Sequence, residues 1–83
     1  MQVIIDTGSK DEAHLVAGAL GGRATATSVR GFGLVKTICR TRRDLEQLFT
    51  TVERTVDSHD LRWVRVRYGD DERVFRSRAS SAA

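Results

Sequence analysis

The chain has 83 residues, a net charge of +3 and one cysteine, and a chain of this length forms a single domain with a thin core between two layers of secondary structure. No apolar run approaches the roughly 20 residues of a membrane span, and the N-terminus lacks the basic region and long apolar stretch of a secretory signal. We therefore expect a cytoplasmic protein.

The first segments predict a strand followed by a helix. Residues 1–6, MQVIID, are rich in β-branched side chains with both alternating faces apolar, which is typical of a central strand. In SKDEAHLVAGALGG, residues 9–22, Ser9 and Glu12 have the spacing of a capping box. Apolar residues follow at helical spacing until two glycines, so this segment predicts a helix.

The middle of the chain predicts a strand pair and a second helix. The segments ATATSV (24–29) and LVKTICR (34–40) are rich in Thr, Val and Ile, and they flank the turn RGFG. The segment 41–60 is predicted to be a helix, in which Thr41 is the N-terminal cap and Asp44 follows three positions later. One apolar stripe continues along this helix and consists of Leu45, Leu48, Phe49, Val52 and Val56.

The last segments predict a hairpin, in which LRWVRVRY (61–68) and RVFRS (73–77) flank the turn GDDE. Residues 79–83, ASSAA, are expected to form a disordered tail. Alternation along the segment 61–68 gives this strand two faces, one with Val64, Val66 and Tyr68 and the other with Trp63, Arg65 and Arg67.

The order strand, helix, hairpin, helix, strand is that of the split βαβ arrangement, in which two helices cover one face of an antiparallel sheet. We therefore predict an α+β fold over residues 1–78, a ferredoxin-like βαββαβ sandwich with an extra C-terminal edge strand.

The stretch IIDTGS resembles the active-site signature of the aspartic proteases. In that family the motif lies beyond a substantial β-hairpin, whereas here five residues precede Asp6 and a helix follows. A strand that turns into a helix explains the same letters, because Gly8 gives the turn its freedom, Ser9 caps the helix and Asp6 lies near the positive helix terminus. We expect Asp6 not to be catalytic. No other catalytic constellation is visible, so we do not expect an enzyme.

The remaining reactive side chains give no sign of a cofactor. Cys39 cannot form an internal disulfide, and its apolar neighbours predict a buried, unreactive thiol. His14 and His59 are far apart in the sequence and lack acidic or cysteine companions, so they read as ordinary surface residues. We expect no metal and no other cofactor.

The segment RGFGLVKT, Arg30–Thr37, resembles the octapeptide signature of the RNA recognition motif, a ferredoxin-like family of about this length. Leu34 and Thr37 stand where that family has aromatic residues, and Ile4 stands where its companion motif has another. Because bases stack on these rings in the family, the resemblance implies RNA binding with Phe32 as the surviving ring. A glycine turn that contains an aromatic residue explains the same letters. The matching positions are Arg30, Gly31, Phe32, Gly33 and Val35.

Basic residues are concentrated in two segments. Residues 13–43 contain six basic residues and no acid, and residues 61–78 contain six arginines. This uneven distribution of charge favours a polyanion as partner, although an arginine-rich composition alone also places many arginines on a protein surface. If Tyr68 pairs with Arg73 across the hairpin, Arg65 faces Arg76, and opposed like charges indicate an anion between them.

Two functions follow from these features. The first is a small module that binds nucleic acid weakly and with little sequence preference through the open face of the sheet. The sequence does not distinguish RNA from DNA as its ligand. The alternative is a non-enzymatic regulatory or assembly module that forms a homodimer or binds a protein partner through the same face. The expected nucleic-acid contacts are Arg30, Phe32, Lys36, Trp63, Arg65, Arg67 and Arg76. The expected partner or dimer contacts are Ile4, Phe32, Leu34 and Trp63.

Overall fold

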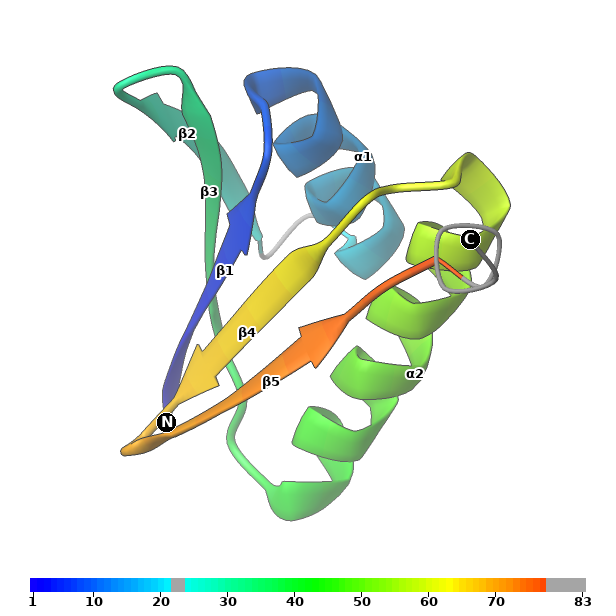
Figure 1. The fold of residues 1–83 in the computed structure, drawn as a ribbon. Coiled ribbons are helices and arrows are strands. Elements are labelled where there is room, and N and C mark those ends of the chain that lie inside the picture. The colour runs from blue at the N-terminus through cyan, green and yellow to red at the C-terminus, as the bar shows by residue number, and fades with distance from the viewer. Residues whose placement is uncertain (22–23, 78–83) are drawn as a thin grey trace.

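A computed structural model describes residues 1–21 and 24–77 of the chain. The expected α+β fold is confirmed, since two helices accompany a five-stranded antiparallel sheet (Figure 1). The expected tail, residues 79–83, lies outside the described residues. The elements in chain order are β1 (Gln2–Thr7), α1 (Lys10–Leu20), β2 (Thr25–Val29), β3 (Phe32–Ile38), α2 (Arg42–His59), β4 (Val64–Tyr68) and β5 (Asp71–Phe75).

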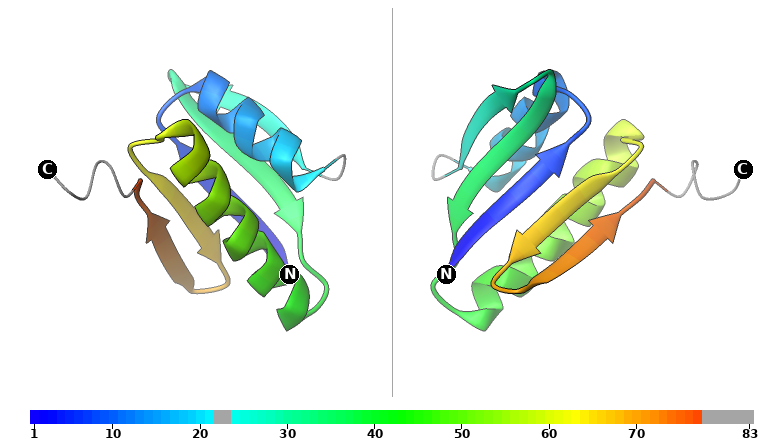
Figure 2. Two further views of the ribbon diagram at one scale, coloured as in Figure 1. Left: turned by 90° about the vertical axis from the view of Figure 1, so that its right-hand side faces the viewer. Right: turned by 60° about the vertical axis from the view of Figure 1, so that its left-hand side comes forward.

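The strands lie in the order β2-β3-β1-β4-β5, and every neighbouring pair is antiparallel. Both helices lie on one face of this sheet (Figure 2). Within the described part of the chain, no helix covers the opposite face, which we name the open face. The first strand is central, so its side chains reach the middle of both faces.

The helices begin at the caps that the sequence predicts. The Ser9 hydroxyl accepts a hydrogen bond from the Glu12 backbone nitrogen at 3.2 Å, but the Glu12 carboxylate accepts from Gly8 at 2.9 Å rather than from Ser9. The first capping box is therefore only half formed. Thr41 and Asp44 form the complete reciprocal pair at the start of α2. A cap of this kind stabilises a helix by about 1 kcal/mol.

The core lies between the two helices and the sheet. Leu48, Val52 and Val56 of α2 are buried, as the predicted apolar stripe requires. The ring centroid of Phe49 lies 5.2 Å from that of Tyr68 in an edge-to-face contact, which closes one side of the core. Neither helix in the described residues combines the length and apolar character needed to cross a membrane. The sheet contributes Val3, Ile5, Val35, Val64, Val66 and Phe75.

The cysteine and the histidines lie where their neighbours in the sequence predict. The Cys39 side chain is buried, and this burial raises the pKa of the thiol, with the negative charge of Asp44 adding to the effect. A raised thiol pKa keeps the group protonated and unreactive at neutral pH. His14 and His59 are exposed.

The hairpin between β2 and β3 is tighter than the expected RGFG turn. Arg30 and Gly31 alone form it, both with positive φ (52° and 85°), and Val29 pairs with Phe32. Gly33 belongs to β3. Glycine is required there by close packing and not by the geometry of the turn. A Cβ at this position would collide with the carbonyl oxygen of Ser9.

The hairpin between β4 and β5 is also tighter than expected. Gly69 and Asp70 form the turn, and Tyr68 pairs with Asp71 rather than with Arg73. Gly69 has a positive φ of 57°, which closes the chain within two residues. The acidic residues that the sequence analysis assigned to the turn therefore begin β5.

This register changes the neighbours of the arginines on β4. Arg65 lies opposite Val74, and Arg67 lies opposite Glu72. The expectation that Arg65 faces Arg76, with an anion between the two arginines, is therefore wrong. The shorter turn is the cause, because it moves every residue of β5 by two positions along β4.

Candidate functional site

Alternation along the strands determines which side chains reach the open face. Val3, Ile5 and Thr7 of β1 are buried toward the helices, so Ile4 and Asp6 between them point to the open face. The register then places the neighbours of these two residues on β3, β4 and β5. Two rows cross the sheet, one of Lys36, Ile4, Arg67 and Glu72 and one of Leu34, Asp6, Arg65 and Val74.

Close to the β2–β3 turn, the open face has a shallow pocket of about 480 Å³. Both aromatic rings of the expected site, Phe32 and Trp63, line it, and we name it the Phe32–Trp63 pocket. Arg30 at the turn and the two arginines of β4, Arg65 and Arg67, line it as well. The pocket therefore brings together most of the residues that the sequence analysis expected to bind nucleic acid. Lys36 and Arg76 are not among its lining residues.

The rings are accessible to a ligand in different degrees. Phe32 is 57% exposed, and its cross-strand neighbour Val29 is exposed too. Trp63 is half-buried. Phe32 is therefore the more accessible of the two side chains for stacking with a planar ligand.

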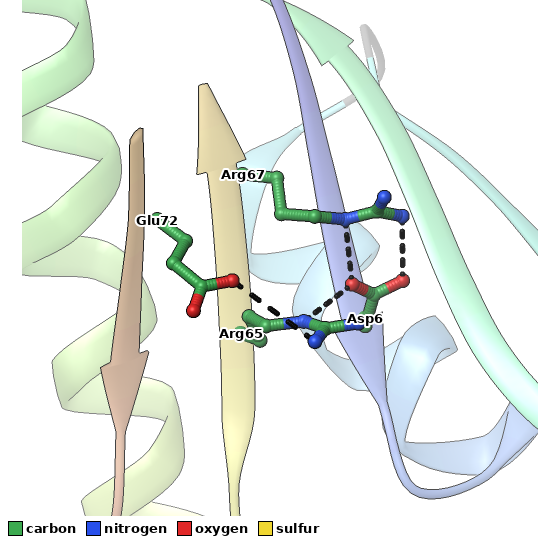
Figure 3. A network of polar contacts seen from close by, with 4 residues as sticks. All are labelled: Asp6, Arg65, Arg67 and Glu72. Atoms are coloured by element: carbon green, nitrogen blue, oxygen red, sulfur yellow. Dashed lines mark hydrogen bonds and ion pairs between the residues drawn. The ribbon is translucent and has the colours of Figure 1, made fainter. Parts of the chain in front are cut away.

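Asp6 lies at the centre of a cluster of charged side chains on the open face (Figure 3). Its Oδ2 accepts a hydrogen bond from Arg65 Nε at 3.0 Å, and its Oδ1 accepts one from Arg67 Nη2 at 3.0 Å. Arg67 Nε forms an additional ion pair with Oδ2 at 2.8 Å. Arg65 Nη1 lies 4.0 Å from Glu72 Oε2. We name these four residues the Asp6 cluster.

The position of Asp6 corrects the sequence analysis, which put its carboxylate near the start of α1. The helix start is instead satisfied by Ser9 and Glu12, and the Asp6 side chain pairs with arginines of β4. This side chain is only 15% exposed. A carboxylate so far removed from water depends on charged partners, because desolvation alone disfavours its ionised form.

The Asp6 cluster neutralises the arginines that were expected to bind phosphate. Two arginines and two carboxylates leave it without net formal charge, so it adds little long-range attraction for a polyanion. The remaining cations of the expected site are exposed and form no ion pair within residues 1–21 and 24–77. They are Arg30, Lys36 and Arg76.

The residues of the alternative interface also share the open face. Ile4 and Leu34 are half-buried there, and Phe32 is exposed beside them. Val74, which the sequence analysis did not include, is 47% exposed on β5, but Asp6 and Arg65 lie between it and Leu34. The same face thus offers apolar contacts on β3 and on β5, with charged side chains between them.

The octapeptide that resembles the RNA recognition motif forms the turn and most of β3. Leu34 reaches the open face, whereas Thr37 pairs with buried Val3 and faces the helices, so its identity does not alter the open face. Phe32 is the single ring that the octapeptide supplies, and Trp63 joins it from the segment before β4. Comparisons with protein-family models, with curated proteins and with solved structures give no match. The resemblance therefore stays a prediction.

Sequence reasoning missed Asp6 and Glu72 as members of the site. The available signal was alternation, which puts Asp6 on the same face as Ile4 and puts Arg65 and Arg67 on one face of β4. What alternation does not give is the register between β1 and β4, and only that register brings Asp6 beside Arg65.

Proposed function

We propose that this domain binds single-stranded nucleic acid on its open face, weakly and with little sequence preference. The observation that carries the proposal is the Phe32–Trp63 pocket, in which two rings lie among three arginines. Stacking of a base on an aromatic side chain contributes roughly 1–3 kcal/mol and tolerates any base. One exposed ring and one half-buried ring give a modest stacking surface, and hence modest affinity.

The phosphates are held mainly by cations outside the Asp6 cluster. Arg30, Lys36 and Arg76 have no carboxylate partner in the described residues, so they can bind phosphate without first breaking an ion pair. Each phosphate contact on a single strand contributes a salt slope of roughly −0.7. Three contacts give a slope of about −2 in log K against log salt.

The proposal also concerns the fold family to which this domain belongs. We infer a ferredoxin-like topology, for which the support is the order β2-β3-β1-β4 together with two helices on one face, β5 being the extra edge strand. The likeness of Arg30–Thr37 to the RNA recognition motif supports RNA as a ligand. Since phosphates and stacked bases are common to both nucleic acids, we expect RNA and DNA to bind comparably.

Fluorescence anisotropy with labelled oligouridine and oligothymidine at 50 mM salt tests this proposal. Phe32→Ala should weaken binding by roughly 5- to 100-fold, because it removes the most accessible ring. Val74→Ala is the matched control, since Val74 is a similarly exposed apolar residue on the same face but outside the pocket. The absence of binding by the wild type, or equal binding by Phe32→Ala, would overturn the proposal.

A second candidate function rests on the apolar surface of the open face. Val29 and Phe32 are exposed side by side there, next to half-buried Leu34, and small monomers rarely leave a large apolar patch uncovered. This observation favours a homodimer or a protein partner covering the face. Such a partner and a nucleic acid would compete for the same surface.

A further inference from the structure

We infer that Asp6 is an internal competitor for Arg65 and Arg67, and that it thereby limits the affinity of the open face for nucleic acid. This inference rests on the proposed function and concerns the regulation of the same site. It assigns to Asp6 the role of an affinity-limiting residue, in contrast with the catalytic role that its DTGS motif suggests.

The geometry of the Asp6 cluster supports competition. An arginine binds a carboxylate and a phosphate through the same fork of nitrogens, because both anions present two oxygens to it. In Arg67 this fork lies against the two oxygens of Asp6: Nη2 donates a hydrogen bond to Oδ1, and the buried Nε forms an ion pair with Oδ2 without the geometry of a hydrogen bond. In Arg65 the Nε–H is directed to Asp6 Oδ2. A phosphate can take these donors only after Asp6 has lost them.

Asp6 itself cannot easily leave the cluster. It lies on the central strand, where β3 and β4 both pair with its backbone, and its short side chain is 15% exposed. The arginine side chains are 42% and 43% exposed and are long, so they have more room to turn away than Asp6 has. If they turn toward a phosphate, they leave a poorly hydrated carboxylate without partners, which is unfavourable. Phosphates therefore bind preferentially at Arg30, Lys36 and Arg76.

The variant Asp6→Asn tests this inference, because it keeps the size of the side chain and removes its charge. The two arginines then become available, and the number of phosphate contacts increases from three to five. At roughly −0.7 per contact, the salt slope should change from about −2 to about −3.5. At 50 mM salt the affinity for labelled oligothymidine should increase on the order of 10- to 100-fold.

Glu72→Gln is the matched control. It removes one negative charge from the same face, but Glu72 approaches Arg65 only to 4.0 Å and its side chain is 59% exposed. We expect the affinity to change by less than about threefold and the slope to stay near −2, since screening weakens an exposed charge. In an Asp6→Asn background, the changes Arg65→Ala and Arg67→Ala together should return the slope to about −2.

A measurement on the wild type avoids any dependence on the folding of a variant. Guanidinium Nε signals in nuclear magnetic resonance spectra should shift for Arg30 when oligothymidine is added at 50 mM salt, and should stay in place for Arg65 and Arg67. If the signals of Arg65 and Arg67 move as much as that of Arg30, Asp6 does not compete.

The outcomes separate this inference from the proposed function. If neither the wild type nor Asp6→Asn binds oligothymidine at 50 mM salt, both the proposed function and the inference are wrong. If both bind with the same slope and affinity, the inference alone is wrong. A gain for Glu72→Gln equal to that for Asp6→Asn also contradicts it, because net charge would then explain the effect.

Discussion

Asp6 and Arg67, which are 61 residues apart in the chain, share a hydrogen bond of 3.0 Å and an ion pair of 2.8 Å on the open face of the sheet. The contact joins β1 to β4 through side chains in addition to their backbone ladder. It gives the opening DTGS motif a role in the sheet, since the carboxylate that resembles a catalytic aspartate is occupied by arginines.

Removing one partner of this contact should destabilise the domain. Arg67→Ala leaves Asp6 with Arg65 alone, and a carboxylate that is 15% exposed depends on such partners. Because the arginine itself is 43% exposed, solvent reduces the effect to about 1–2 kcal/mol. Urea denaturation of the wild type and the variant measures this loss in the free energy of unfolding. Arg76→Ala, which removes an exposed arginine without an ion pair in the described residues, should change stability by less than about 0.5 kcal/mol; equal effects of the two changes would contradict the prediction.

Gly33→Ala should destabilise the domain by about 2 kcal/mol or more. A Cβ at this position would overlap the Ser9 carbonyl oxygen and the Thr7 hydroxyl, so the start of α1 must move away from β3. Gly18→Ala is the control within α1. Nothing lies within 4 Å of its added methyl group, and it should stabilise the helix by up to about 1 kcal/mol. Thermal unfolding of both variants gives the comparison, and a Gly33→Ala variant as stable as the wild type would show that the close approach is absent.

Cys39 should react slowly with a thiol reagent in the folded protein. Burial raises the pKa of this thiol, so less thiolate is present at pH 8 than in the unfolded chain. The same shift favours folding below the pKa of the unfolded thiol, and this contribution is lost as the pH rises through the folded pKa. Reaction with a disulfide reagent at pH 8, with and without urea, measures the difference. Equal rates in the two conditions would contradict it.

Leu34→Asp distinguishes the two candidate functions. If the open face mediates self-association, the wild type should sediment as a dimer or larger species and this variant should shift toward monomer, because it places a charge in the apolar surface. Leu15→Asp is a suitable control, since Leu15 is a partly exposed apolar residue on α1, away from the open face. A wild type that stays monomeric at high micromolar concentration would exclude the homodimer.

The sequence was sufficient for the elements and the core because those depend on local patterns. The cap at Thr41 and the stripe through Leu48 and Val52 determine α2, and both are present in the structure. The sequence predicts both hairpin turns too long, because neither RGFG nor GDDE specifies which two residues form the turn. In RGFG the second glycine serves close packing against α1, which depends on tertiary structure and is not visible in the sequence.

The candidate site was predicted in part. Alternation correctly put Trp63, Arg65 and Arg67 on one face, and the pocket contains all three. The pairing of Asp6 with those arginines was missed, because it depends on the register between strands that are far apart in the chain. The charge of the site consequently differs from the expectation, since the central arginines are already neutralised.

The fluorescence of Trp63 provides the most direct test of the proposed nucleic-acid interface. Trp63 is the only tryptophan of the chain and lines the pocket, so its emission responds to a ligand bound there. Titration of the wild type with unlabelled oligothymidine at 50 mM salt should quench this emission in a saturable manner, and added salt should reverse the quenching with a slope of about −2. Emission that stays unchanged at every concentration of oligothymidine and oligouridine would contradict the account.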